Sequence, residues 1–211
     1  MKESLVLIGG GGHCKSCIDV IESENRFRIA GILDLPERKG QEISGYPVIG
    51  IDADIPELAK IHKNFFITMG HIQAPGFRIK MYQHLKELGL ILPVIISPSA
   101  HVSQKATIGE GTIVMHQVIV NTEARIGANC ILNSGSLIEH ETSVGDHCHI
   151  STKVVLNGQC QIGSGCFIGS STVLANNTDI QDHTLISAGS VVLRSLTRSG
   201  TYIGNPLRKI R

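Results

Sequence analysis

The second half of the chain carries an aliphatic residue at every sixth position, sixteen times without a slip. Neither an α-helix, with 3.6 residues per turn, nor a strand, with a period of two, produces this spacing. A hexapeptide period predicts a parallel β-helix, in which the chain winds in coils of three short strands. The aliphatic series is Val102, Ile108, Val114, Val120, Ile126, Leu132, Ile138, Val144, Ile150, Leu156, Ile162, Ile168, Leu174, Ile180, Ile186 and Val192.

The residue four positions after each aliphatic one is small or β-branched from Ala106 to Ser190, and only Leu196 breaks the rule. A second period of 18 residues places glycine at 109, 127, 145 and 163. Three six-residue faces therefore form one triangular coil with glycine at a repeated corner. Sixteen hexads predict about five coils, and strands about 4.8 Å apart give a prism on the order of 25 Å long.

Residues 1–96 have a different pattern of apolar residues. Apolar runs at 5–8, 28–34 and 65–70 predict strands, and they alternate with two predicted helices. Strands that alternate with helices indicate a parallel sheet, so this half is predicted to be a small Rossmann-like α/β domain. The predicted units are residues 1–96, a β-helix over 97–193 and a tail over 194–211. Two sets of apolar residues share a predicted helix face: Cys14, Cys17, Ile18 and Ile21 in the first helix, and Ile79, Tyr82, Leu85 and Leu88 in the second.

Composition narrows the functional classes. The 19 basic and 18 acidic residues nearly balance, which argues against a nucleic-acid binder. No apolar run approaches the roughly 20 residues that span a bilayer, and no signal peptide is evident, so we expect a cytoplasmic protein without a membrane partner. Its six cysteines are then expected to be reduced thiols.

Four cysteines, Cys130, Cys148, Cys160 and Cys166, occupy the small position of the repeat, where a free thiol packs as a small hydrophobe. Cys14 and Cys17 form a C-x-x-C motif, which leaves two interpretations open. The motif is typical of thiol redox sites, but the preceding glycine run favours phosphate binding. No second C-x-x-C follows, so no zinc site is predicted.

His140 lies between Glu139 and Glu141 in the β-helix. A histidine beside a carboxylate is typical of a general base and its orienting partner, and equally of an exposed polar corner. Gly158 follows His140 by 18 residues, which places it in the same column of the next coil. His149 follows by nine residues, half a coil further round. These two spacings favour a functional role.

The run from Gly9 to Gly12 ends the first predicted strand and opens the first helix. Backbone N–H groups at a helix start bind phosphate, so Gly10, Gly11 and Gly12 are candidate phosphate ligands. The dinucleotide fingerprint is incomplete, because its third glycine is missing in either register. Asp34 ends the second predicted strand, where an acidic residue meets a ribose.

These motifs resemble known proteins. The repeat is similar to that of the hexapeptide-repeat acyltransferases, which have a left-handed β-helix. More narrowly, the whole chain resembles the bacterial UDP-4-amino-sugar N-acetyltransferases, the perosamine N-acetyltransferases and the sialic acid O-acetyltransferase-like proteins. The motifs that carry this resemblance are Ile8-Gly9-Gly10-Gly11-Gly12-His13, Glu139-His140-Glu141 with His149, and Tyr202-Ile203-Gly204-Asn205-Pro206.

The resemblance implies an acetyl-CoA-dependent N-acetyltransferase that acts on a nucleotide-linked deoxy-amino sugar in bacterial surface glycan synthesis, without a metal. It further implies a homotrimer with active sites between subunits. His140 would be the general base and Glu141 its partner. The implied cofactor-binding residues are His149, Gly158, Ala188, Gly204, Asn205 and Arg208, with Lys209 and Arg211 near the CoA phosphates. The implied sugar-nucleotide residues are Gly10, Gly11, Gly12, His13, Asp34 and Gly70.

Two departures from the family pattern bear on the nucleotide. Leu35 replaces a second acid after Asp34, and Gly70-His71-Ile72 is followed by the inserted-looking Gln73-Ala74-Pro75-Gly76. Three alternatives stay open: O-acetylation of a sialic-acid-like sugar, a nicotinamide-dependent oxidoreductase with a β-helix scaffold, and a scaffold without catalysis.

Overall fold

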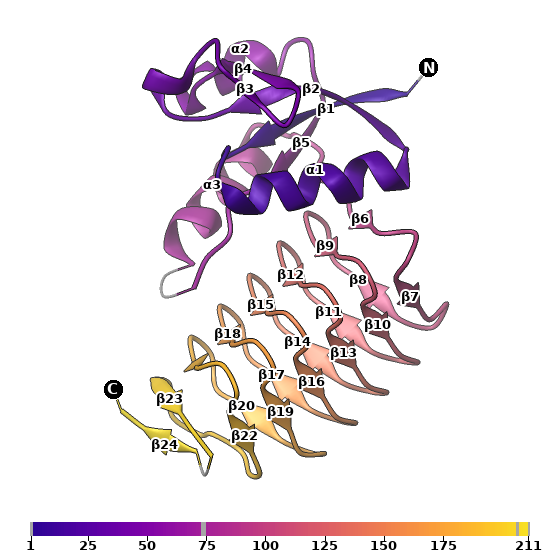
Figure 1. Cartoon of the computed structure of the whole chain (residues 1–211), viewed down its shortest axis with the longest axis vertical. Coiled ribbons are helices and arrows are strands. Elements are labelled where there is room, and N and C mark those ends of the chain that lie inside the picture. The colour runs from indigo at the N-terminus through magenta and orange to yellow at the C-terminus, as the bar shows by residue number, and fades with distance from the viewer. Residues whose placement is uncertain (1, 73–74, 206, 211) are drawn as a thin grey trace.

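The computed structural model describes residues 2–72, 75–205 and 207–210. An α/β domain lies on one end of a β-helix whose coils descend toward the C-terminus (Figure 1). Among the described residues, no helix is long and apolar enough to cross a bilayer.

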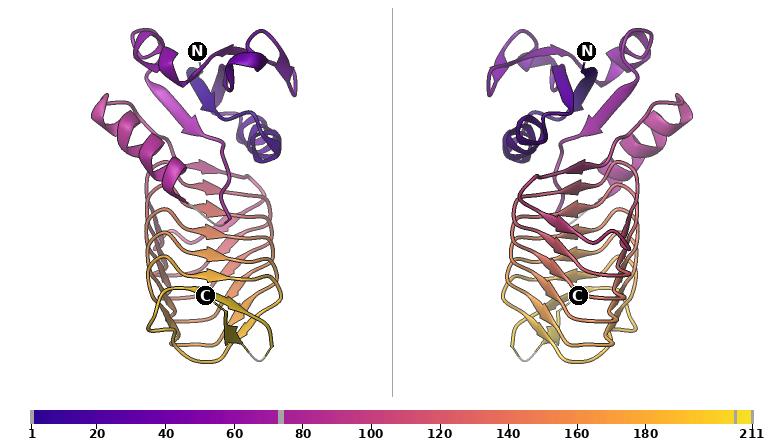
Figure 2. Two further views of the ribbon diagram at one scale, coloured as in Figure 1. Left: turned by 90° about the vertical axis from the view of Figure 1, so that its left-hand side faces the viewer. Right: turned by 90° about the vertical axis from the view of Figure 1, so that its right-hand side faces the viewer.

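The N-terminal sheet has five strands in the order β3-β4-β2-β1-β5. Strands β1, β2, β4 and β5 run parallel, and β3 pairs antiparallel to β4. Helix α1 packs on the face nearer the β-helix, while α2 and α3 pack on the other face (Figure 2). The strands are β1 (Glu3–Ile8), β2 (Phe27–Leu33), β3 (Glu42–Ile43), β4 (Tyr46–Gly50) and β5 (Asn64–Ile67). The helices are α1 (Gly12–Glu24), α2 (Ile55–Leu58) and α3 (Gly76–Glu87), with 3-10 turns at Pro36–Arg38 and Asp52–Asp54.

The apolar face predicted for α1 is confirmed, since Cys14, Cys17, Ile18 and Ile21 are all buried. The face predicted for the second helix is confirmed only in part: Leu85 is buried and Tyr82 packs against the same core, but Ile79 is only half-buried. In α3 the buried residues are Arg78, Met81 and Leu85, whereas Leu88 is exposed. Arg78 displaces the expected apolar residues because it reaches the junction with the β-helix. The β3–β4 hairpin and α2 had no counterpart in the prediction, which was based on longer apolar runs.

From β6 to β22 the β-helix consists of strands of two residues, each paired in parallel with the strand 18 residues away. Face 1 adjoins the N-terminal domain: β6 (Ile95–Ile96), β9 (Ile113–Val114), β12 (Ile131–Leu132), β15 (His149–Ile150), β18 (Phe167–Ile168), β21 (Leu185–Ile186), β23 (Thr201–Ile203) and β24 (Arg208–Lys209). Face 2 contains β7 (His101–Val102), β10 (Ile119–Val120), β13 (Leu137–Ile138), β16 (Val155–Leu156), β19 (Val173–Leu174) and β22 (Val191–Val192). Face 3 contains β8 (Thr107–Ile108), β11 (Arg125–Ile126), β14 (Ser143–Val144), β17 (Gln161–Ile162) and β20 (Asp179–Ile180).

Both ends of the β-helix differ slightly from the predicted limits. Strand β6, at Ile95–Ile96, already pairs with β9, so the first coil begins before residue 97. At the other end, β23 adds to face 1 beside β21, and β24 turns back antiparallel to it. The tail is therefore part of the sheet that closes the last coil.

The predicted core of the prism is confirmed. From Val114 to Val192 every aliphatic residue of the series is at most 4% exposed, and only Val102 and Ile108, in the first coil, are partly exposed. The small positions from Thr112 to Ser190 are also buried. Cys130, Cys148, Cys160 and Cys166 are among them, and all six cysteines are free thiols.

The corner glycines serve close stacking of the coils. A Cβ at Gly109 would lie 2.5 Å from the backbone nitrogen of Ala128 in the next coil. The left-handed turn residue comes two positions later, with φ 68° at Gly111 and a positive φ at every sixth residue from there to Gly189. Non-glycine residues occupy most of these turns, and Glu141 is one of them, with φ 58°.

Candidate active site

His140 and Glu141 form the corner between faces 2 and 3. Because Glu141 is the left-handed turn residue, its side chain bends back beside the ring of its neighbour. His140 Nδ1 lies 3.2 Å from Glu141 Oε2, and Gln159 Nε2 donates to the same oxygen at 3.1 Å. A carboxylate only accepts hydrogen bonds, so the proton of neutral His140 lies on Nδ1 and Nε2 carries a lone pair. This is the arrangement of a general base.

Gly158 lies beside the His140 ring, as the 18-residue spacing predicts. A Cβ at Gly158 would come within 2.6 Å of His140 Cε1 and Nε2, and 3.2 Å from Asn176 Nδ2. Only glycine leaves room for the imidazole here. Within the described part of the chain, the Gly158 N–H has no hydrogen-bond acceptor, so this donor is available to a ligand next to His140.

His149 lies elsewhere, on face 1. With His13, Gly70, His71, Ile72 and Asn133 it lines a cavity of about 630 Å³ between the N-terminal domain and the β-helix. His149 Nδ1 lies 2.7 Å from the carbonyl oxygen of His71. The rings of His13 and His149 are 6.4 Å apart between centroids. The structure thus brings together two residues, His13 and His149, that are far apart in the sequence.

A buried guanidinium, that of Arg78, lies near this cavity and contributes to its electrostatics. Arg78, 2% exposed, donates from Nη1 to the carbonyls of Ile67 and Met69, and from Nε to Asn129 of the β-helix. Burial lowers the pKa of Arg78 to about 10. Burial, aided by the Arg78 charge, also lowers the pKa of His13 and of His71 to about 3. Both imidazoles are therefore neutral at physiological pH.

A second cavity, of about 730 Å³, continues along face 1 toward the C-terminus. Ile72 lines both cavities, so the two are neighbours. Ala188 lies in the second cavity, together with Phe167, Gly169 and Thr201. Its lining comes from the neighbouring strands β18, β21 and β23 and their turns, and we call this second cavity the groove.

The other predicted cofactor residues lie around the β23–β24 hairpin. The Gly204 N–H donates to Ser190 Oγ at 3.2 Å, which holds the hairpin on the last coil. Asn205 and Arg208 are exposed to solvent and do not line the second cavity. Pro206 and Arg211, which belonged to the predicted motif and phosphate-binding set, are outside the described residues.

The predicted phosphate turn lies at the open start of α1. A Cβ at Gly11 or Gly12 would meet no atom within 4 Å, and helix α1 begins at Gly12. Gly10 lies against the Asp34 carboxylate, which pairs with Arg38 at 2.8 Å. A cavity of about 280 Å³ next to them is lined by Asp34, Leu35, Pro36, Asp52 and Phe77, among others.

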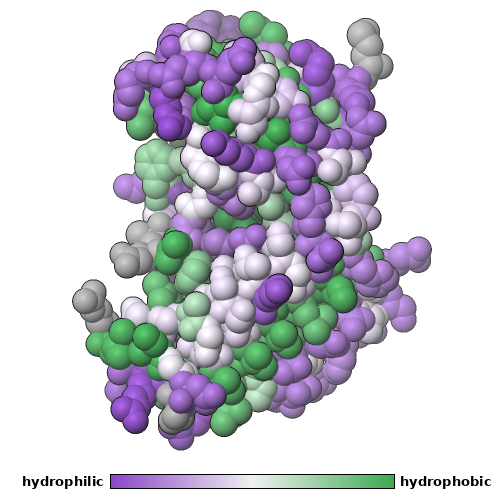
Figure 3. All heavy atoms as spheres, viewed as in Figure 1, coloured by the Kyte–Doolittle hydropathy of each residue, from purple (hydrophilic) through white to green (hydrophobic). Residues whose placement is uncertain are grey.

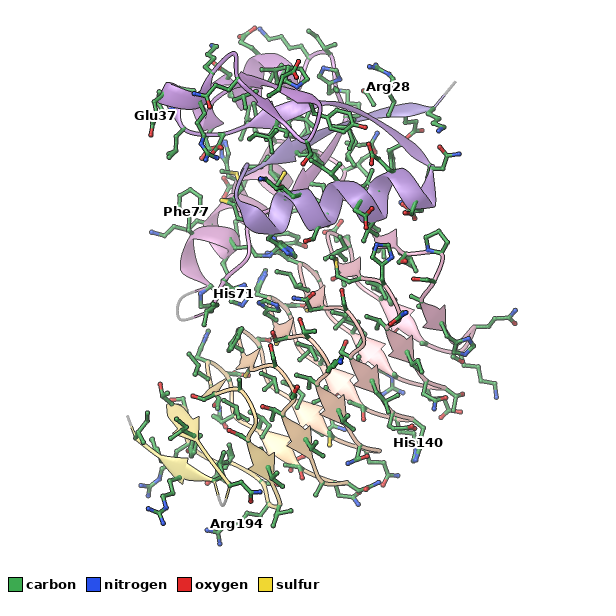
Figure 4. All side chains as sticks on the ribbon, in the orientation of Figure 1. Arg28, Glu37, His71, Phe77, His140 and Arg194 are labelled. Atoms are coloured by element: carbon green, nitrogen blue, oxygen red, sulfur yellow. The ribbon has the colours of Figure 1, made fainter. Side chains whose placement is uncertain are left out.

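The candidate residues therefore form two groups within one chain. His140, Glu141 and Gly158 lie at the corner opposite face 1, whereas His13, His149 and Ala188 lie along face 1 and its corner with face 2. Figure 4 shows His71 beneath the N-terminal domain and His140 at the far edge of the β-helix. Gly158 and His149 are both predicted to bind the cofactor, but the structure separates them across face 2.

The C-x-x-C cysteines lie under the glycine turn, away from solvent. Burial raises the pKa of both Cys14 and Cys17, the opposite of what an activated thiolate requires. Among the described residues, no group of three or more His, Cys, Asp or Glu side chains is arranged to hold a metal ion.

The sequence patterns assigned no role to Asn133 and marked His71 only as part of a departure from the family pattern. Asn133 Nδ2 lies 3.3 Å from His149 Nε2. The only available signal for Asn133 was its position directly after Leu132, at a corner of the coil. His71 lines the cavity, and Arg78 bonds to Asn129 of the β-helix, only because one domain packs on the other, and no local sequence pattern reports that.

Comparisons with known proteins cover both halves of the chain. Residues 4–85 match the family model of the PglD N-terminal domain, and residues 105–140 and 141–176 match that of the bacterial transferase hexapeptide repeat. PerB from Caulobacter crescentus, solved with CoA and GDP-perosamine, is 30% identical over 99% of this chain and 97% of its own, with a TM-score of 0.91. The acetyltransferase domain of PglB from Neisseria gonorrhoeae, also solved with acetyl coenzyme A, is 26% identical over 99% of this chain and 100% of its own, with a TM-score of 0.91.

A third structure, WeeI from Acinetobacter baumannii, is 21% identical over 98% of this chain and 100% of its own, with a TM-score of 0.82, and shares the fold. The chain belongs to the PglD-like family of hexapeptide-repeat acetyltransferases. It is an acetyl-CoA-dependent sugar acetyltransferase.

Proposed function

We propose that the protein transfers the acetyl group of acetyl-CoA directly to the amino group of a nucleotide-linked deoxy-amino sugar, with His140 as the general base. The observation that carries this proposal is the pairing of His140 Nδ1 with Glu141, which leaves Nε2 free beside the Gly158 N–H. A proton acceptor and a hydrogen-bond donor thus lie side by side, as acyl transfer requires.

In the proposed reaction the sugar amine attacks the thioester carbonyl carbon. A C–N bond forms, and the amine proton passes to His140 Nε2. The Gly158 N–H donates to the carbonyl oxygen as it gains negative charge. The C–S bond then breaks, and the CoA thiolate receives the proton from His140. Glu141 stabilises the imidazolium during the exchange. No step forms an acyl-enzyme, so no cysteine is required as a nucleophile.

The two cavities on face 1 suggest where the ligands bind. We place acetyl-CoA in the groove that contains Ala188, with its thioester directed toward His149. The nucleotide sugar fits the N-terminal domain, with its diphosphate at the start of α1 and its sugar near His13. PerB was solved with CoA and GDP-perosamine, and the acetyltransferase domain of PglB with acetyl-CoA, so relatives of this chain bind both classes of ligand.

Because His140 lies across face 2 from the groove, we propose that each active site forms between two copies of the chain in a homotrimer. Five residues of extended chain across the face span about 16 Å, too far for one copy to unite both groups. Face 2 is apolar outward and face 3 is polar, and the apolar stripe crosses the lower part of Figure 3. The stripe consists of Ile119, Leu137, Val155, Val173 and Val191. An exposed apolar stripe of this kind favours burial against a second copy.

The substrate class is tested by following CoA release from acetyl-CoA with a panel of UDP-, GDP- and dTDP-linked amino sugars. The matched hydroxyl sugars and free nonulosonic acids serve as controls. Transfer to at least one nucleotide-linked amino sugar is expected, with mass spectrometry showing one added acetyl group on nitrogen. Transfer only to a hydroxyl group of a free sugar would contradict N-acetylation.

Sites shared between copies are tested by complementation. His140→Ala removes the base, and Ala188→Trp fills the groove, so each variant alone should be inactive. Mixed by unfolding and refolding together, they should regain a fraction of wild-type activity, because some interfaces combine an intact base with an intact groove. Activity that never exceeds that of the separate variants would place the whole site in one chain.

A further inference from the structure

His149 is held in a single tautomer by its surroundings. Its Nδ1 lies 2.7 Å from the His71 carbonyl oxygen, and a carbonyl can only accept a hydrogen bond. Nδ1 must therefore carry the proton. The pKa of His149 is lowered to about 4, mainly by burial, so the ring is neutral at physiological pH. Because Nδ1 carries the proton, Nε2 has a lone pair.

The side-chain amide of Asn133 independently indicates the same tautomer of His149. The Ser134 N–H donates to Asn133 Oδ1 at 2.8 Å, which fixes the orientation of the amide. The NH₂ group of Asn133 then faces His149, with Nδ2 3.3 Å from Nε2. A donor directed at Nε2 requires an unprotonated nitrogen there. At 3.3 Å this contact is longer than the usual range for an N–H donor, so a closer donor can take its place.

We propose that His149 is a fixed hydrogen-bond acceptor whose Nε2 receives an N–H of the attacking amine. This inference rests on the proposed function. A thioester offers only acceptors, its carbonyl oxygen and its sulfur, so an acceptor nitrogen cannot hydrogen-bond to the acetyl end of the cofactor. The amine is the hydrogen-bond donor at the reacting centre. When His149 holds one N–H of the amine, the lone pair of the amine nitrogen can point at the carbonyl carbon. The other amine proton remains available to His140.

Three features of the cavity agree with this assignment. His149 shares the cavity with His13 of the N-terminal domain, which lies on the proposed sugar side. Its position is fixed from both ends, since the ring also packs edge-on against His71 and Phe167. The segment that holds it is itself fixed, because Arg78 Nη1 donates to Met69 just before Gly70 and His71. The acceptor nitrogen is therefore in place before substrate binds.

The tautomer is tested on the wild-type protein without substrate. Long-range proton–nitrogen NMR of histidine-labelled protein distinguishes protonated from unprotonated ring nitrogens, and the His149 signals are assigned by their loss in His149→Gln. A protonated Nδ1 and a bare Nε2 are expected from about pH 6 to pH 8. A protonated Nε2 in that range would overturn the proposal. This measurement needs no activity, so its result is separate from that of the proposed function.

The ligand is tested by kinetics on His149→Phe, with His84→Gln on the exposed surface of α3 as the control. We expect KM for the amino sugar to rise about tenfold, the effect of one lost hydrogen bond, while thermal stabilisation by CoA stays as in the wild type. Retained stabilisation by CoA also shows that the variant is folded. An unchanged KM for the sugar together with weakened acetyl-CoA binding would assign His149 to the cofactor and overturn the proposal.

Discussion

The ring of His140 lies so close to Gly158 that a methyl group on this glycine would come within 2.6 Å of ring atoms Cε1 and Nε2. Gly158→Ala should therefore displace the imidazole from its place beside the Gly158 N–H. We expect kcat to fall at least about tenfold with little change in melting temperature, because the site is at a surface corner. Gly76→Ala is the control, since a Cβ there meets no atom within 4 Å. Full activity in Gly158→Ala would show that the contact between Gly158 and His140 is not part of the active site.

The base itself is the next target. His140→Asn should lower kcat by roughly 10²- to 10⁴-fold, the usual contribution of general acid–base catalysis. The side chain lies outside both face 1 cavities, so acetyl-CoA should still raise the melting temperature by the wild-type amount. Isothermal calorimetry with CoA checks this separation of binding from chemistry. Wild-type turnover in His140→Asn would refute the proposed mechanism.

Glu141 and Glu123 are a matched pair. They occupy the same left-handed turn in successive coils, with φ 58° and 60°, but only Glu141 follows a histidine. Glu141→Gln should reduce kcat roughly 10- to 100-fold, because the neutral amide stabilises the His140 imidazolium less. Glu123→Gln should keep wild-type kinetics. Equal losses in both variants would indicate that the turn, and not the charge, supports activity.

Low pH should destabilise the fold through the histidines between the domains. The pKa of His13 and of His71 falls from 6.5 to about 3 on folding, and that of His149 to about 4, mainly through burial. The unfolded chain then binds more protons than the folded one, so stability is lost as pH falls below about 6.5. Urea unfolding at fixed protein concentration should show a lower free energy at pH 5 than at pH 7. His71→Phe should show a smaller difference, and His84→Gln the wild-type difference.

The cysteines should be inert in the native protein. All six are buried free thiols, four of them inside the prism, and burial raises the pKa of Cys14 and Cys17. Reaction with an aromatic disulfide reagent should be at least about 100-fold slower than after unfolding, since all six thiols are buried in the folded chain. Cys14→Ser should retain acetyl transfer. Rapid labelling with loss of activity would revive the redox interpretation of the C-x-x-C motif.

The sequence by itself determined the β-helix, because a period of six admits one aliphatic and one small residue per face and leaves no other regular packing. It also placed His140 beside Gly158, since 18 residues return the chain to the same column. The pairing of Glu141 with His140 was only partly determined by the sequence. Adjacency in a strand would direct the two side chains apart, and only the left-handed turn bends the carboxylate toward the ring.

Only the tertiary structure decided the rest. The approach of His13, His71 and Arg78 to His149 depends on how one domain packs on the other, and each comes from a segment without a repeat. The tautomer of His149 follows from a main-chain carbonyl 78 residues away. The separation of the base His140 from the groove at Ala188 also depends on which face of the β-helix meets the N-terminal domain. Periodicity reports which residues share a column, but it says nothing about which corner of a prism meets another domain.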